Sequence, residues 1–118
     1  MKRISSFSNI YLYRYPIDFR KQMNGLCVLV QEELELPVFE NNLFVFTNKN
    51  RSRLKMLYWD KTGFALWYKR LEKSKFKWPR KLTSDTQKLS SQQLDWLLEG
   101  YDYSKFTPHK HIEYAALY

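Results

Sequence analysis

The stretch Arg51–Leu71, RSRLKMLYWDKTGFALWYKRL, decides the fold because it holds two strand-like runs around a short turn. Residues 53–59 and 64–71 are rich in aromatic and aliphatic side chains, and the four residues between them, DKTG, have the composition of a β-turn. We expect a three-residue loop, Lys61–Gly63, that ends on a glycine in the left-handed conformation. The pattern predicts a β-hairpin at the centre of the chain.

The length of this loop assigns every hairpin residue to a face, because side chains alternate across a strand. A three-residue loop pairs Trp59 with Ala65, Leu57 with Trp67 and Lys55 with Lys69. One face is then basic with two indoles: Arg51, Arg53, Lys55, Lys69, Trp59 and Trp67. The other is apolar and forms the predicted core: Leu54, Met56, Tyr58, Phe64, Leu66 and Tyr68. Facing lysines destabilise a sheet, which favours an anionic partner for the basic face or a nearby glutamate.

The segments before the hairpin predict a strand, a helix and a second strand. Residues 10–15 are a short aromatic strand, and residues 43–47 are a continuous apolar one. Between them the apolar positions Phe19, Met23, Leu26, Val30 and Leu34 recur every three or four residues, as on one face of a helix. We expect Asp18 to cap this helix, which places Arg20 and Lys21 in its first turn, and we expect its apolar face to pack on Leu54 and Met56.

The segments after the hairpin predict a second helix. Ser90 and Gln93 have the spacing of a capping box, and the leucines that follow lie on one helical face before Gly100 ends the helix. Residues 76–78 are a candidate fourth strand, and residues 80–89 are expected to form a polar connection. The prediction is one α+β domain over residues 1–118: a small antiparallel sheet of three to five strands, one helix across it, a second helix at the C-terminal side, and an irregular tail at 101–118.

The composition of the chain limits the classes of function that it can have. The 118 residues carry a net charge of +8, and residues 48–81 hold twelve lysines and arginines against two acids. Concentrated cations among aromatic rings favour a nucleic-acid partner, although a solvated face neutralised by the acidic ends has the same composition. One cysteine excludes an internal disulfide. The absence of a long apolar run and of a signal-peptide pattern predicts a cytoplasmic protein that does not bind membranes.

The candidate site is a DNA-binding surface without catalytic residues, cofactor or metal. The expected phosphate contacts are Arg51, Arg53, Lys55, Lys69, Arg70, Lys75 and Lys77, with Trp59 and Trp67 as stacking rings or core residues. The acids have structural interpretations: Asp18 as a cap, Asp60 in a turn and Glu72 in an ion pair. Cys27 is interpreted as a core thiol. His109 and His111 are a pair without a third ligand, which is weak support for a metal site.

The central motif resembles the TnpB accessory proteins of the IS sixty-six family of bacterial insertion sequences. The resemblance rests on Asp18-Phe19-Arg20-Lys21, on RSRLKMLYWD at 51–60, on Gly63-Phe64, on Tyr68-Lys69-Arg70-Leu71-Glu72 and on Phe76-Lys77-Trp78-Pro79. It extends to Leu94–Gly100, whereas Ser74 replaces a frequent glycine and the last 18 residues match nothing. These proteins are distinct from the much larger RNA-guided nucleases that share the name.

The resemblance implies a protein that is encoded beside a separate transposase and assists transposition. The lack of a catalytic constellation in the sequence predicts that this role is nonenzymatic. Two functions remain open at this stage. The first is binding of DNA, at the element ends or nonspecifically, through the basic hairpin face. The second is a protein–protein adaptor that holds the transposase or another accessory protein, because aromatic and arginine side chains are also enriched at protein interfaces.

Overall fold

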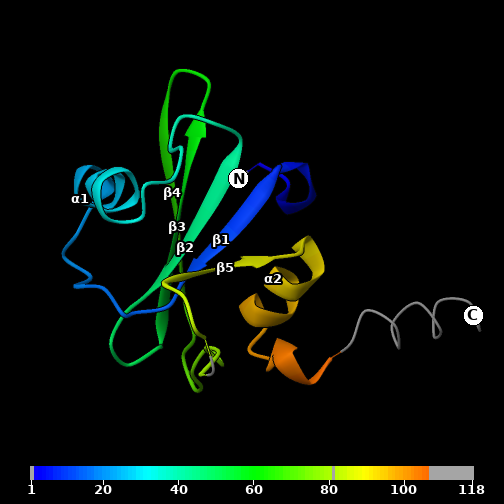
Figure 1. Ribbon diagram of the computed structural model, residues 1–118. Helices are drawn as coiled ribbons and strands as arrows, with labels where there is room; N and C mark the ends of the chain where they lie inside the picture. The colour runs from blue at the N-terminus through cyan, green and yellow to red at the C-terminus, as the bar shows by residue number, and fades with distance from the viewer. Residues whose placement is uncertain (1, 81, 107–118) are drawn as a thin grey trace, which may run out of the picture.

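The central hairpin consists of β3 (Arg53–Asp60) and β4 (Gly63–Arg70) in a computed structural model that describes residues 2–80 and 82–106. Together with β1 (Asn9–Tyr13), β2 (Asn42–Thr47) and β5 (Thr86–Leu89) it forms one sheet in the order β4-β3-β2-β1-β5 (Figure 1). The tip of the hairpin lies at one end of the sheet, and the β2–β3 turn lies at the other.

The hairpin loop has two residues, Lys61 and Thr62, because Asp60 pairs with Gly63. The expected three-residue loop is therefore wrong, and the left-handed backbone belongs to Lys61 (φ 54°) instead of Gly63. The one-residue difference changes the register of the whole hairpin. The observed pairs are Arg53–Arg70, Leu54–Lys69, Lys55–Tyr68, Met56–Trp67, Leu57–Leu66, Tyr58–Ala65 and Trp59–Phe64.

The sheet is mixed, because β1 and β2 run parallel while the other neighbours run antiparallel. The predicted all-antiparallel sheet is wrong at this pair. A parallel pair needs a long crossover, and residues 14–41 provide one that contains the first helix. The fourth predicted strand at 76–78 is absent from the described structure, whereas β5 lies in the stretch that was expected to be a polar connection.

The first helix, α1 (Met23–Val28), continues as a π-helical turn, η2 (Leu29–Glu33), and packs on one face of the sheet. Its buried residues join a cluster from β2 and β3: Leu26, Cys27, Leu29, Val30, Phe44, Phe46 and Leu57. The predicted partner face is wrong, because Leu54 and Met56 point to the other side. The helix also begins at Met23, which is itself exposed, so residues 19–22 precede it.

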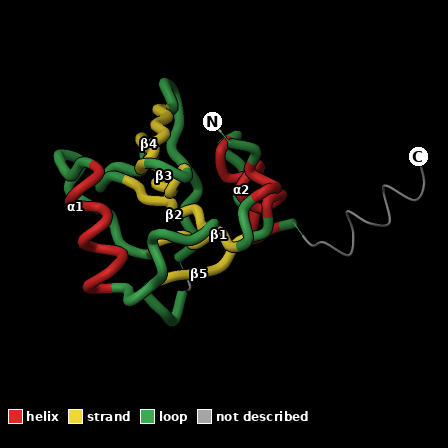
Figure 2. The backbone as a smooth tube through the Cα atoms, turned by 90° about the horizontal axis from the view of Figure 1, so that it is seen from above, coloured by secondary structure: helices red, strands yellow, loops and turns green. Residues whose placement is uncertain are grey.

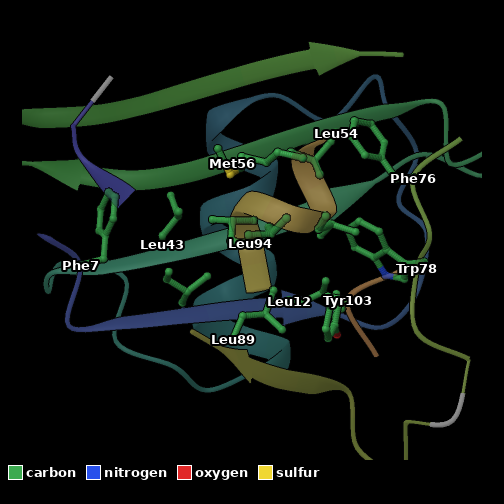
Figure 3. Packing of buried hydrophobic residues seen from close by; sticks show 14 of the residues in the cluster. Phe7, Leu12, Leu43, Leu54, Met56, Phe76, Trp78, Leu89, Leu94 and Tyr103 are labelled. Carbon is green, nitrogen blue, oxygen red and sulfur yellow. The ribbon is translucent and has the colours of Figure 1, made fainter. Parts of the chain in front are cut away.

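The second helix, α2 (Ser91–Leu98), covers the opposite face of the sheet, as the view along the sheet shows (Figure 2). Figure 3 shows Leu94 of this helix over Leu43 and Met56. The predicted capping box is confirmed, because the Ser90 side chain accepts from the Gln93 backbone while the Gln93 side chain accepts from Ser90. Short 3₁₀ turns, η1 (Ile4–Ser6) and η3 (Tyr103–Lys105), border this layer.

The two helices leave neither face of the sheet open at its centre. All six residues of β2 are buried, as expected for a strand that is covered on both sides. The α+β class with a helix across the sheet and a second, later helix is confirmed. Most of the expected tail, residues 107–118, lies outside the described residues.

Truncation of Leu26 should test the α1 layer. Leu26 has no exposed surface, so Leu26→Ala should lower the free energy of unfolding by about 2–5 kcal/mol through lost burial and a cavity. Val28, on the same helix, is 55% exposed, and Val28→Ala should change it by less than ~0.5 kcal/mol. Urea denaturation followed by tryptophan fluorescence measures both. Equal effects of the two changes would show that this helix does not pack as described.

Candidate nucleic-acid interface

Two segments that are distant in sequence meet at the end of the sheet opposite the hairpin tip. The β2–β3 turn, residues 48–52, lies beside the segment 71–80 that follows β4. Backbone hydrogen bonds join them: Leu71 N–H donates to the Ser52 carbonyl (2.9 Å), and Phe76 N–H donates to the Arg51 carbonyl (2.7 Å). We call this region, residues 48–53 and 70–80, the basic end.

Asn48 organises the turn. Its side-chain oxygen accepts from the Arg53 backbone (3.0 Å), and its amide donates to the Ser52 hydroxyl (3.2 Å). The Arg51 N–H donates to the Asn48 carbonyl (3.1 Å), which leaves Arg51 with a φ of 60°. An asparagine that bonds to nearby backbone in this way is typical of a tight turn. These hydrogen bonds hold the turn in one shape, and they therefore fix the backbone from which its basic side chains extend.

Two arginines face each other where β3 and β4 leave the turn. Arg53 and Arg70 are cross-strand partners, and both side chains are exposed. The like-charge pair was expected at Lys55 and Lys69; in the observed register Arg53 and Arg70 form it instead. Arg70 forms an ion pair with Glu72 (2.9 Å), as expected for Glu72, and this hydrogen bond raises the pKa of Arg70. Arg53 has no ion pair within the part of the chain that the structure describes.

The segment 71–80 adds further exposed cations. Lys75 and Lys77 lie there as predicted, and Lys73 and Arg80 accompany them, while Lys49 lies on the adjoining turn. Sequence reasoning placed Lys49, Lys73 and Arg80 in the basic block but not in the candidate site. No periodicity marked them, because their position depends on the loop folding back against the β2–β3 turn.

Lys55 does not belong to an exposed basic face. Its side chain is only 6% exposed, and Nζ donates to the carbonyls of Phe19 and Lys21 (both 2.8 Å). The ammonium also lies 4.4 Å from the centre of the Phe19 ring. Burial lowers the pKa of Lys55 below its usual value. Its charge therefore holds the segment before α1 against the sheet, and the expectation that it contacts phosphate is wrong in this fold.

Lys69 also has an internal role. It lies on the other face of β4, and its Nζ donates to the Leu98 carbonyl at the C-terminal end of α2 (2.7 Å). A cation is favoured there because the last helical carbonyls carry partial negative charge. Lys69 thus links β4 to α2. The prediction that Lys55 and Lys69 share one face of the hairpin is wrong, because the observed register places them on opposite faces.

The two tryptophans lie on opposite faces. Trp59 packs edge-on against Phe39 and Phe64 near the hairpin tip, with ring centres 5.1 and 5.0 Å apart. Trp67 pairs with Met56 and borders the α2 core. Their predicted common face is wrong. Trp59 is also six residues along β3 from Arg53, or roughly 20 Å, so it lies far from the basic end.

The acids gather into no cluster among residues 2–80 and 82–106 that would suggest a metal. Asp18 does not cap α1: its carboxylate binds the Arg20 side chain and backbone, and these contacts lower its pKa to about 2. Arg20 and Lys21 accordingly precede the helix. Asp60 ends β3 next to the loop, and Cys27 is a buried thiol whose pKa burial raises. His109 and His111 lie outside the described residues.

The chain is a small α+β protein whose sheet is covered by helices on both faces and whose cations gather at the basic end. Comparison with known proteins shows the family to which the chain belongs. The family model described as IS66 Orf2 like protein matches residues 8–108, and the chain belongs to this family of insertion-sequence accessory proteins. The resemblance seen in the sequence is thereby confirmed.

Two proteins of Sinorhizobium fredii are similar to this chain. The uncharacterized protein y4jC is 36% identical over 90 residues, which cover 76% of each chain. The uncharacterized protein y4hO is 37% identical over 86 residues, or 73% of this chain and 74% of its own. No solved structure matches. No helix in the described part of the chain is long and apolar enough to cross a membrane.

Lys55→Met should destabilise the protein, because it leaves the Phe19 and Lys21 carbonyls without their donor. We expect the free energy of unfolding to fall by about 1–3 kcal/mol. Arg53→Met, two residues away on the same strand face but exposed, should change it by less than ~0.5 kcal/mol. Denaturant titration of the two variants measures the difference. A Lys55→Met protein as stable as Arg53→Met would contradict the buried role of this lysine.

Proposed function

We propose that this insertion-sequence accessory protein binds DNA through the phosphate backbone, with the basic end as the contact surface. The observation that carries the proposal is the convergence of two segments that bring seven exposed cations together: Lys49, Arg53, Arg70, Lys73, Lys75, Lys77 and Arg80. Glu72 is the one acid in these segments, and it is paired with Arg70. Such a surface has a strong positive potential and attracts a polyanion.

The surface suits backbone contact better than reading of bases. Its cations lie on a turn, at strand ends and on an irregular segment, and within residues 2–80 and 82–106 none of them belongs to a helix that could enter a groove. Phosphate contacts fix position but carry no sequence information. DNA binding by this end alone is therefore expected to be of similar strength for element ends and for other duplexes, and selectivity would come from the transposase.

A binding role, in place of catalysis, is supported by the contacts of the acids. The Asp18 and Glu72 carboxylates are each engaged by an arginine, and they lie on separate segments. Two-metal cleavage of DNA needs carboxylates that converge on a shared pair of ions. We accordingly propose that the chain positions DNA for an enzyme encoded separately.

The adaptor function is favoured by a different observation. Phe39 is 58% exposed and packs against Trp59 and Phe64 near the hairpin tip. Exposed aromatic side chains of this kind are enriched at protein interfaces. This cluster lies at the far end of β3 from the basic end, so the same molecule has room for DNA at one end and a protein at the other.

Replacing Arg53 and Arg70 together by glutamine should reduce the salt dependence of DNA binding. If both contact phosphate, the slope of log affinity against log salt should flatten by about two units. Fluorescence anisotropy with a labelled duplex over a range of sodium chloride concentrations measures the slope. The fold should be retained, as shown by an unchanged circular dichroism spectrum.

Arg3→Gln/Lys61→Gln is the matched control, because it removes the same charge from exposed positions outside the basic end. Its slope should stay near that of the unaltered protein. Equal slopes for both double variants would mean that binding follows net charge alone. An absence of binding at low salt, combined with loss of transposase co-purification in Phe39→Ala, would favour the adaptor instead.

A further inference from the structure

A cavity of about 640 Å³ opens beside the basic end. The segment 75–80 forms one wall, and β5 together with η3 forms the other. Figure 3 shows the lining residues Phe76, Trp78 and Tyr103 at one end of the α2 core. The Trp78 indole donates to the Tyr13 carbonyl (3.0 Å), and the Tyr103 hydroxyl donates to Gln87 (2.6 Å), so both rings are held in place.

Arg51 lines this cavity, and one of its side-chain nitrogens is buried without a hydrogen-bond acceptor in the described part of the chain. Its guanidinium lies over the Trp78 ring, 5.8 Å from the ring centre. Its Nη1 is buried and has no hydrogen-bond acceptor among the described residues. A buried charged donor without a partner is costly, and the left-handed backbone of a non-glycine residue adds strain. Strained residues cluster at active sites, ligand clamps and switch regions.

The other charges around the cavity increase this demand for an anion. Lys75, Lys77 and Arg80 also line it. Burial, and then the charge of Arg80, lower the pKa of Arg51. The lining acid is Asp102, whose carboxylate accepts from the hydroxyl and the backbone of Ser104; these hydrogen bonds lower its pKa and keep it ionised, so it offsets one of the cations. Four cations and one carboxylate therefore line the cavity, which leaves a clear excess of positive charge around it.

The geometry points to a phosphate site in this cavity, with the guanidinium of Arg51 as one cation and Arg80 as the second. A planar guanidinium matches the oxygens of a phosphate group and binds them by paired hydrogen bonds. The cavity is larger than a phosphate ion, so it has room for the sugar to which the phosphate is attached. Identification of the phosphate as part of a DNA strand rests on the proposed function.

Inorganic phosphate is the first probe. Thermal unfolding is compared in sodium phosphate and in sodium chloride at matched ionic strength and pH. Phosphate at about five times its Kd should raise the Tm of the unaltered protein by roughly 4–6 °C. Arg51→Met should abolish this rise, whereas Arg3→Met, which removes an exposed cation outside both the cavity and the basic end, should retain it.

The behaviour of Arg51→Met without phosphate separates a ligand-binding role from a structural one. Since the arginine is desolvated and repelled by Arg80, its removal should leave the Tm unchanged or higher. A lower Tm, together with a retained phosphate effect, would overturn the site. Arg80→Met is a second variant that removes an exposed side chain, and it should weaken the phosphate effect without lowering the Tm. An unaltered protein that does not respond to phosphate would also overturn the site.

DNA binding distinguishes this inference from the proposed function. If Arg53→Gln/Arg70→Gln flattens the salt slope but phosphate has no effect, the DNA surface stands and the cavity site is wrong. If phosphate stabilises the protein through Arg51 but no duplex or single strand binds, the strand is not the source of the phosphate. A mononucleotide that stabilises the protein as phosphate does, and that competes with labelled DNA, would support the strand as the source.

Discussion

The two-residue loop at Lys61–Thr62 is the constraint on which the rest of the fold depends. It pairs Asp60 with Gly63, and the alternation of side chains then assigns each residue of β3 and β4 to a face. Leu54 and Met56 point to α2, while Lys55 and Leu57 point to α1. A loop longer by one residue would re-pair the two strands and face Lys55 against Lys69. The observed register instead gives each lysine its own carbonyl acceptors.

Coverage of both faces explains how a basic chain of this size forms a core. The two clusters lie on opposite sides of β2, so a fully buried central strand contributes to both. Lys55 and Lys69 are the charged residues of the hairpin strands that lie on these faces, and each donates to backbone carbonyls. The other charged residues of β3 and β4 lie at the ends of the strands, where turns and loops are solvated. Concentration of cations at the β2–β3 turn is therefore a consequence of the layer architecture, and it creates the surface that we propose for DNA.

The sequence predicted the elements whose signals are local. The hairpin strands, the apolar strand at 43–47 and the capping box at Ser90 were found because alternation, composition and cap spacing act over a few residues. The pairing of strands that are distant in sequence and the register of the hairpin were missed, because they depend on contacts outside the local pattern. The parallel partner of β1 follows from a crossover, and β5 has one buried residue, Leu89, which gives no strand pattern of its own.

The candidate site was predicted only in part, because its charges are a local feature of the sequence whereas their exposure depends on contacts between distant segments. Charge counting located the basic block, and Arg53, Arg70, Lys75 and Lys77 are exposed at one end of the sheet. It did not separate these residues from Lys55, whose acceptors are backbone carbonyls some 35 residues earlier in the chain. The cavity around Arg51 could not be predicted from the sequence, because four separate segments line it. It also depends on a left-handed backbone at Arg51, which the residue type does not indicate.

Amide chemical shifts of the labelled protein during titration with a short duplex test the central claim most directly. An interface at the basic end requires the largest shifts in residues 48–53 and 70–80, with the hairpin tip and α1 unaffected. The shifts should shrink as salt is added, because phosphate contacts release counterions. Shifts centred on Phe39, Trp59 and Phe64, or none at low salt, would contradict DNA binding through this end.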